Sequence, residues 1–224
     1  MSWALKKGSY RAKQSIARFV MKKMTFDEPL VIKGSGSLKK LPGKIKADGI
    51  NNVLVVTDKG LMSLGLLDCL FEELMEKKIQ FTVYDGVQPN PTIDNIENAN
   101  NMYLNNNCEA LVAFGGGSSM DCAKVAGARA NNPNQSVKAM RGIFKIKKPI
   151  PPFYAVPTTA GTGSETTIAA VVTDPSTHEK FAISDKKIVP NVAVLDPDLT
   201  IGLPKHITST TGMDALTHAV EAYI

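Results

Sequence analysis

The chain has 224 residues, of which 43% are hydrophobic and 21% are charged. This composition is typical of a soluble globular protein that can bury a core without disulfides. No run of roughly 18 or more apolar residues occurs, so we expect no membrane span. Cys69, Cys108 and Cys122 are odd in number and widely spaced, which argues against a disulfide framework or a cysteine zinc site and indicates a reducing compartment, the cytoplasm.

The net charge of +5 is concentrated at the N-terminus. Residues 1–24 hold seven basic side chains and no acid, whereas the rest of the chain has 19 basic against 21 acidic side chains. We therefore treat residues 1–29 as a basic N-terminal extension. Such a segment can be a transit peptide or a membrane-surface helix, but without an apolar core a solvated helix folded onto its own protein is favoured. The basic bias does not extend into the domain, so nucleic-acid binding is not expected.

From about residue 30, short β-rich runs alternate with longer amphipathic runs. We predict strands over 30–32, 53–57, 80–84, 110–114, 152–156 and 192–195. We predict helices over 62–78, over 93–106 with Thr92 as the cap, and from Ser118 onward. The stretch 168–194 has a pattern typical of a hairpin. This order predicts an α/β fold with a doubly wound, mainly parallel sheet, a Rossmann-like dinucleotide-binding domain over residues 30–207.

The last residues have helical spacing, with Thr208–Thr211 as cap candidates and a helix from Gly212 to Ile224. Its apolar stripe needs a packing partner, and the run reaches Ile224 without a residue that usually ends a helix. We therefore interpret residues 208–224 as the first helix of an all-α second domain, and expect the sequence to be truncated.

A glycine run, Gly115-Gly116-Gly117-Ser118-Ser119, lies between a predicted strand and a predicted helix. The free amides and positive dipole end of a helix N-terminus suit a pyrophosphate, and glycines let the anion approach the backbone. A plain strand-to-helix turn is the alternative, since the run does not match Gly-x-Gly-x-x-Gly. The similar run Gly34–Leu38 is interpreted as a structural turn.

Two further features lie at predicted strand ends. Asp58 could accept hydrogen bonds from the adenosine ribose, which favours NAD over NADP, or could simply cap a helix; position alone does not decide. The segment Pro157–Glu165 carries four hydroxyls and two glycines, which suit ligand phosphates, ribose or an amide. Its alternative role is capping of a following helix by Thr162 and Ser164.

Asp214 and His218 are four residues apart on the last predicted helix and so share a face. A carboxylate and an imidazole on one face can bind a divalent metal, but an exposed ion pair explains this pair equally simply. Two ligands are also fewer than catalytic metal sites use. His178 and His206 are not expected to be ligands.

Taken together, these motifs resemble the iron-containing (group III) alcohol dehydrogenases, especially the bacterial branch with butanol and propanediol dehydrogenases. The matching segments occur in the family's order and spacing. They are Asp85–Thr92, Gly115–Lys124, Ala155–Thr167 and Gly212–Tyr223.

The resemblance implies a role for each matching residue. Asp58 corresponds to the ribose-binding aspartate. Contacts with the pyrophosphate and the rest of the cofactor are implied for Asn90, Gly116, Gly117, Ser118, Thr158, Thr159, Thr162, Thr167, Lys180 and Leu199. Asp214 and His218 correspond to the first two metal ligands. The family's two remaining histidine ligands, from the helical second domain, do not occur in this sequence, so we expect this chain to be inactive alone.

The implied activity is an oxidoreductase that transfers a hydride between a primary alcohol and NAD, or reduces an aldehyde in reverse, with NADP less favoured. The implied metal is Fe²⁺, with Zn²⁺ as the alternative, and it lowers the pKa of the alcohol. The expected partners are a small alcohol or aldehyde and a second copy of the chain, in a dimer. No nucleic-acid or membrane partner is expected. Two alternatives stay open, a non-catalytic nucleotide-binding module and a dehydroquinate synthase-like lyase on the same fold.

Overall fold

The computed structural model describes residues 28–223. The predicted basic segment 1–24 lies outside these residues. Within the described part, no helix is both long enough and apolar enough to cross a membrane.

The centre of the molecule is a sheet of six strands whose hydrogen-bonded neighbours all run parallel. Their order across the sheet is β1-β9-β6-β4-β2-β3. The strands are β1 (Leu30–Lys33), β2 (Asn52–Val56), β3 (Gln80–Tyr84), β4 (Ala110–Gly115), β6 (Phe153–Pro157) and β9 (Val192–Leu195). The strand predictions and the parallel sheet are thus confirmed, with boundaries that differ by a residue or so.

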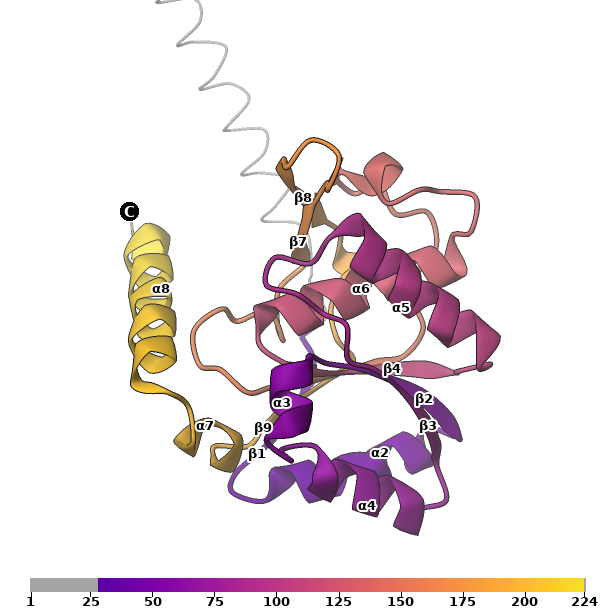
Figure 1. The fold of residues 1–224 in the computed structure, drawn as a ribbon, viewed down its shortest axis with the longest axis vertical. Coiled ribbons are helices and arrows are strands. Elements are labelled where there is room, and N and C mark those ends of the chain that lie inside the picture. Colours follow the sequence, from indigo (N-terminus) through magenta and orange to yellow (C-terminus); the bar gives the residue numbers. More distant parts are fainter. Residues whose placement is uncertain (1–27, 224) are drawn as a thin grey trace, which may run out of the picture.

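Helices cover both faces of this sheet (Figure 1). One face carries α5 (Ile93–Asn105) and α6 (Gly117–Asn131), and the other carries η1 (Ser37–Lys40), α2 (Leu41–Ala47) and α4 (Asp68–Glu76). Successive strand residues point to opposite faces. In β2, accordingly, Leu54 and Val56 join the core under α5 and α6, whereas Val53 and Val55 join the core on the α2 and α4 side. The predicted doubly wound architecture is confirmed.

A second, smaller sheet packs on α6, on the side of the helix away from the large sheet (Figure 1). It contains the predicted hairpin, formed by β7 (Ala169–Thr173) and β8 (Lys180–Ser184), which pair antiparallel. The short strand β5 (Gly142–Ile143) pairs with β8, and the turns η2 (Lys138–Met140) and η3 (Lys186–Ile188) flank the sheet.

The prediction of one helix over 62–78 is wrong. The structure has two helices there, α3 (Lys59–Ser63) and α4, because Gly65 between them adopts a φ of +67° that interrupts the helix. The helical spacing of apolar residues continues across this break, so the sequence pattern did not reveal it.

The C-terminal helix begins earlier than predicted. After the short α7 (Asp198–Ile201), α8 spans Lys205–Tyr223, so Thr208–Thr211 lie within it instead of capping it. The hydroxyls of Thr210 and Thr211 donate to the carbonyls of His206 and Ile207, each over 2.9 Å, which is how threonine is accommodated inside a helix. No residue of α8 is buried, and the helix stands beside the main body (Figure 1).

Candidate cofactor-binding cleft

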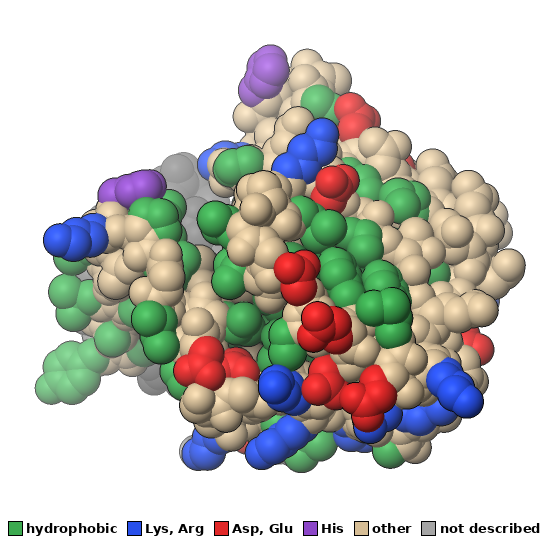
Figure 2. All heavy atoms as spheres, turned by 60° about the horizontal axis from the view of Figure 1, so that its bottom comes forward, with side chains coloured by type: hydrophobic (Ala, Val, Ile, Leu, Met, Phe, Trp, Pro, Cys, Tyr) green, Lys and Arg blue, Asp and Glu red, His purple; other side chains and the backbone are tan. Residues whose placement is uncertain are grey.

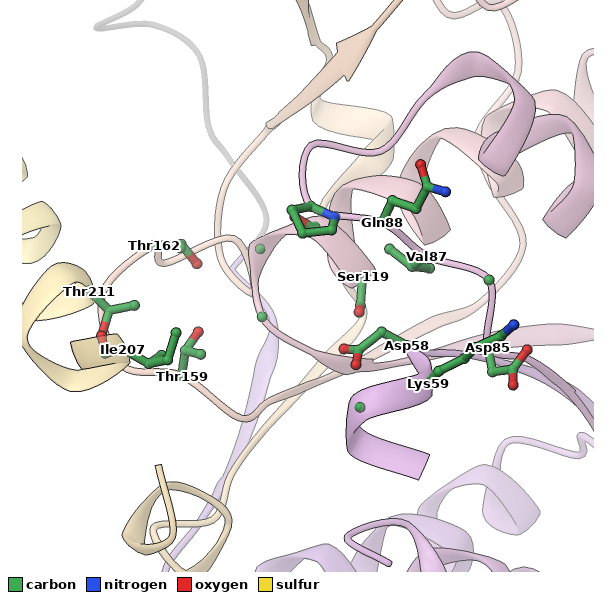
Figure 3. A pocket seen from close by; sticks show the side chains of 16 residues that line it. Asp58, Lys59, Asp85, Val87, Gln88, Ser119, Thr159, Thr162, Ile207 and Thr211 are labelled. Carbon is green, nitrogen blue, oxygen red and sulfur yellow. The ribbon is translucent and has the colours of Figure 1, made fainter. Parts of the chain in front are cut away.

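A cleft of about 620 Å³ opens at the carboxyl edge of the large sheet. Four loops that follow β2, β3, β4 and β6 line it, together with one turn of α8. These strands are neighbours in the sheet, so the loops after them meet at one edge although they are far apart in sequence. Figure 3 shows Thr159 and Thr162 beside α8 on one side of the cleft and Asp58, Lys59 and Asp85 on the other.

The turn from β4 into α6 forms the floor between these two sides. Gly115 has a φ of +149°, and a Cβ there would collide with the side chain of Ser119. Gly116 is the N-cap of α6, and no side chain among residues 28–223 caps this helix end. Gly116, Gly117, Ser118 and Ser119 all line the cleft. The structure therefore directs an uncapped helix N-terminus into the cleft, where amide groups and the helix dipole favour an anion.

The loop between β6 and β7, residues 158–168, is called here the threonine loop, and it packs directly on these glycines. A Cβ on Gly116 would lie 3.3 Å from Thr159 Oγ1, and one on Gly117 would lie 3.2 Å from Thr162 Cγ2. Thr159 Oγ1 is buried and has no hydrogen-bond partner within the described residues. Because a buried hydroxyl without a partner is costly, this oxygen is a ready contact for a ligand in the cleft.

The alternative role of this loop as a helix cap is wrong. Residues 163–166 form a turn, and the chain continues into β7 with no helix between. Ser164 is instead held by α6, as its hydroxyl donates to Asp121 Oδ1 over 2.9 Å. The hydroxyls of the loop are thus divided between the cleft and α6.

Asp58 follows β2 and performs the capping role that the sequence left open. Its Oδ1 accepts from the amide of Leu61 at 3.1 Å, which makes Asp58 the N-cap of α3. Its Oδ2 has no hydrogen-bond partner among the described residues, and the side chain lines the cleft. Capping and ligand binding are therefore compatible at this carboxylate.

Asn90, Ser118 and Lys180 come from three distant segments and form one hydrogen-bonded chain. The amide of Asn90 donates to Ser118 Oγ over 3.2 Å, and Lys180 Nζ donates to Asn90 Oδ1 over 2.9 Å. Asn90 itself adopts a left-handed backbone with a φ of +58°, a conformation that asparagine tolerates better than most residues. Of the three, Ser118 lines the cleft, whereas Asn90 and Lys180 are not part of its lining.

Three other predicted cofactor contacts lie away from the cleft. Thr158 is buried, and its amide donates to the carbonyl of Gly115 over 3.0 Å. Thr167 Oγ1 accepts from Lys124 Nζ at 3.1 Å. Leu199 packs in the core on the α2 and α4 side. None of these three residues is among those that line the cleft in the described structure.

The sequence prediction missed several residues of the cleft wall. The segment 85–89 after β3 lines it, as do Lys59, Ile207 and Thr211. The adjacency of β2 and β3 places 85–89 beside Asp58, where an isolated bridge joins Asp58 and Gly86. No local sequence pattern predicts the contact between the cleft and α8. It depends on tertiary packing of Thr211 against Gly161, where a Cβ would collide with the Thr211 carbonyl.

The other glycine run is a structural turn, as predicted. The amide of Gly36 donates to Asp196 over 3.2 Å and to Asp198 over 3.1 Å, and the amide of Leu38 donates to Asp196 over 2.9 Å. Two carboxylates of the chain therefore already accept hydrogen bonds from the amides that a phosphate would need.

Asp214 and His218 share a face of α8, with His218 Nε2 3.7 Å from Asp214 Oδ1 and side chains 45% and 56% exposed. Carboxylate and imidazole are suitable ligands for a divalent metal. Within residues 28–223, however, no group of three or more His, Cys, Asp or Glu side chains could hold one. The pair thus fits a metal in chemistry but supplies only part of a ligand set. His178 lies in the β7–β8 turn and His206 in the first turn of α8.

An all-parallel doubly wound sheet, with an uncapped helix N-terminus facing an elongated cleft at its carboxyl edge, defines a nucleotide-binding α/β protein. The family model for iron-containing alcohol dehydrogenases matches residues 29–197, and the chain belongs to this family.

Relatives and solved structures agree with this assignment. Alcohol dehydrogenase 4 of Schizosaccharomyces pombe is 44% identical over 191 residues, which are 85% of this chain and 45% of that protein. The crystal structure of a 1,3-propanediol oxidoreductase superposes with a TM-score of 0.84 at 38% identity, over 89% of this chain and 53% of the other. Sulfoacetaldehyde reductase from Bifidobacterium kashiwanohense, solved in complex with NAD⁺, gives 0.76 at 32% identity, over 88% and 53%. The chain thus spans about half the length of the relatives it matches.

Proposed function

We propose that this chain forms the NAD-binding part of a metal-dependent alcohol dehydrogenase, which transfers a hydride between a primary alcohol and NAD or reduces an aldehyde in reverse. The observation that carries the proposal is the uncapped N-terminus of α6 at the floor of the cleft. Family membership and the NAD⁺ complex of the B. kashiwanohense relative support it.

The shape of the cleft suggests how the cofactor lies. The pyrophosphate binds the amides at Gly116–Ser119, the one part of the floor with an open helix end. The adenosine ribose then reaches Asp58, whose Oδ2 is free to accept from its hydroxyls. The nicotinamide half lies toward Thr159 and Thr162, on the opposite side (Figure 3). Asn90 and Lys180 fix Ser118.

Asp214 and His218 are proposed as two ligands of the family's divalent metal, iron or alternatively zinc. When bound, the metal supplies Lewis-acid chemistry that lowers the pKa of an alcohol. α8 carries these two residues together with Ile207 and Thr211, which line the cleft. One rigid helix therefore sets the spacing between the cofactor side and the metal side, which hydride transfer requires to be fixed.

The rest of the assignment concerns the whole protein. We place residues 30–207 in the cofactor domain and residues 208–224 in a helical second domain that contributes the remaining ligands and most of the substrate pocket. A homodimer is the assembly we propose. The three cysteines are unpaired, which favours a reducing compartment such as the cytoplasm.

The direct test is titration of the 224-residue chain with NAD by calorimetry, together with an alcohol-oxidation assay in the presence of Fe²⁺. We expect weak NAD binding and no turnover, because only two metal ligands are available in the described residues. Absence of binding at millimolar NAD would remove the cofactor proposal. Measurable turnover would show that the metal site is complete in this chain. Binding without turnover, even in a longer protein with further histidines, would favour a non-catalytic nucleotide-binding module.

Asp58 provides a test of cofactor choice. Its carboxylate should repel the 2′-phosphate of NADP, so Asp58→Gly should bind NADP relatively better than the unchanged chain. Asp58→Asn is the sharper variant, because asparagine caps a helix as well as aspartate and removes only the charge. We expect the ratio of the NADP and NAD dissociation constants to fall by about tenfold, equivalent to about 1.4 kcal/mol.

The matched control is Asp94→Asn, which removes an exposed carboxylate from the first turn of α5 outside the cleft. It should leave the ratio unchanged. Unchanged selectivity in both Asp58 variants would refute the proposed contact with the ribose.

A further inference from the structure

Lys124 is a fully buried lysine that the cofactor site does not use directly. It lies in the middle of α6 and is among the largest completely buried side chains of the molecule. Lysine is rarely buried without compensating partners, because its ammonium group loses its hydration. The hydrogen-bond partners of its ammonium group therefore show which part of the fold it holds in place.

The ammonium group binds one segment of the chain, the end of the threonine loop. Lys124 Nζ donates to Ser164 Oγ at 3.2 Å, to the Thr167 carbonyl at 2.9 Å and hydroxyl at 3.1 Å, and to the Ala169 carbonyl at 2.9 Å. Four acceptors within six residues thus converge on one lysine.

Asp121, one helical turn earlier on α6, holds the same segment. Its Oδ1 accepts from Ser164 Oγ at 2.9 Å, and its Oδ2 accepts from the amide of Val171 at 3.0 Å. Ser164 therefore bridges the two charged groups, accepting from Lys124 and donating to Asp121. Among residues 28–223, Glu165 of the loop itself is the other charged group that acts on Lys124.

The loop contacts α6 at two levels. Thr159 and Thr162 pack on Gly116 and Gly117 in the first turn of α6, and residues 164–171 are bound to Asp121 and Lys124 further along. Between these levels the loop has little structure of its own, with one turn closed by the Thr166 amide and the Gly163 carbonyl over 2.9 Å. Its conformation thus depends on α6 and, at Gly161, on the contact with Thr211 of α8.

We propose that Asp121 and Lys124 are positioning residues that hold Thr159 and Thr162 against the N-terminus of α6, and so set the affinity for the nicotinamide half of the cofactor. This inference rests on the proposed NAD site. Lys124 touches no part of the cleft and acts through the loop. The adenosine half, bound at Asp58 and the helix end, does not depend on it.

The test compares NAD with 5′-AMP, which has the adenosine half only. Dissociation constants are measured by NMR titration for the unchanged chain, Lys124→Met and Ser164→Ala. We expect Lys124→Met to weaken NAD binding at least tenfold and AMP binding less than twofold. Ser164→Ala keeps both charges and removes only the bridge, so it should give a smaller loss in the same direction and tests the inference even if Lys124→Met does not fold.

Lys138→Met is the matched control, because Lys138 is exposed and pairs with Asp174 in the small sheet. It should change neither constant. Hydrogen exchange supplies an independent readout: the amides of residues 159–166 should exchange faster in Lys124→Met, while those of β4 stay protected.

Equal weakening of NAD and AMP, or no change in either, would overturn the inference while leaving the cofactor site in place. If the unchanged chain binds neither ligand, the proposed function falls as well. The two failures are therefore distinguishable in one experiment.

Discussion

Gly115 shows how one residue determines the geometry of the cleft floor. It ends the central strand β4 at a φ of +149°, a conformation that L side chains rarely adopt. The space beside its Cα is occupied by Ser119, one turn into α6. The backbone can therefore reverse direction tightly enough to present the amides of α6 only with glycine at this position.

We predict that Gly115→Ala lowers the free energy of unfolding by about 1–3 kcal/mol, from backbone strain and collision with Ser119. Gly43→Ala is the control, because Gly43 lies within α2, has an ordinary φ and has open space around a Cβ. It should stabilise the chain by up to about 1 kcal/mol. Urea denaturation measures both, and equal effects of the two substitutions would contradict this account.

The lowered pKa of Lys124 predicts how its contribution to stability changes with pH. Burial lowers the pKa of its ammonium group to about 8 from an ordinary 10.5, and Asp121 and Glu165 offset this only in part. Between these two values the unfolded chain binds more protons than the folded chain, so the contribution of Lys124 to stability rises with pH.

The free energy of unfolding of the unchanged chain, minus that of Lys124→Met, should therefore increase between pH 8 and 10.5. The slope should approach about 1.4 kcal/mol per pH unit at most. Denaturant titrations at a series of pH values give this difference. A flat difference would show that folding leaves the pKa of Lys124 unchanged, and a falling one that folding raises it; either result would contradict the prediction.

At the scale of the elements, the helices differ in whether a side chain caps their N-terminus. α5 begins with a complete capping box, in which Thr92 and Asn95 exchange hydrogen bonds over 3.2 Å in each direction. α3 is capped by Asp58. α6, the helix directed into the cleft, has glycine at its N-cap and no side-chain cap. In the described part of the chain, α2 and α4 also begin without a side-chain cap, but their first turns do not line the cleft. Of the helix ends that do line it, α3 is capped by Asp58 and α6 is left open for a ligand.

Gly116→Asn should close that end. Asparagine at an N-cap accepts from the amides that we assign to the pyrophosphate, and it exceeds glycine as a cap by only a few tenths of a kcal/mol. The new Cβ would lie 3.3 Å from Thr159 Oγ1, so that side chain must shift slightly. We therefore predict a change in the free energy of unfolding of less than about 1 kcal/mol, with NAD affinity reduced about tenfold or more because the amides are already bonded.

Thr92→Asn exchanges one good cap for another on α5 and serves as the control, with no expected loss of NAD affinity. Calorimetric titration of both variants is the measurement. Undiminished NAD binding by Gly116→Asn would contradict the assignment of the pyrophosphate to this helix end.

At the scale of the whole molecule, α8 contributes to the cleft but not to the core. None of its residues is buried, and Met213, Leu216, Val220 and Tyr223 expose at least half of their surface. Figure 2 shows hydrophobic side chains on the lobe that α7 and α8 form at the left of the molecule. Ile207 and Thr211 are the points at which this helix reaches the cleft.

Removal of residues 205–224 should therefore separate stability from binding. We expect the free energy of unfolding to change by less than about 1 kcal/mol, because little apolar surface is returned to water. NAD affinity should fall while AMP affinity is retained, since Ile207 and Thr211 lie on the side assigned to the nicotinamide. Cooperative loss of the whole fold on this deletion would show that α8 belongs to the core.

Much of the domain followed from local patterns. Continuous apolar runs identified the buried strands, turn residues marked most boundaries, and Thr92 was recognisable as a cap. The glycine run after β4 located the floor of the cleft, because a strand, a glycine turn and a helix start are contiguous in sequence. The prediction of a single helix over 62–78 was wrong because apolar periodicity reports which face of a helix is buried and is insensitive to the φ of one glycine, Gly65.

The remainder was decided by tertiary structure. Strand order placed residues 85–89 beside Asp58, and no local pattern encodes which strands become neighbours. Packing turned Thr167 toward Lys124 and brought Thr211 of α8 to Gly161. The amino-acid sequence by itself thus determined the order of elements and the chemistry at their ends, because both depend on adjacent residues. Which of those ends face one another depends on distant segments packing together, and only the folded chain shows it.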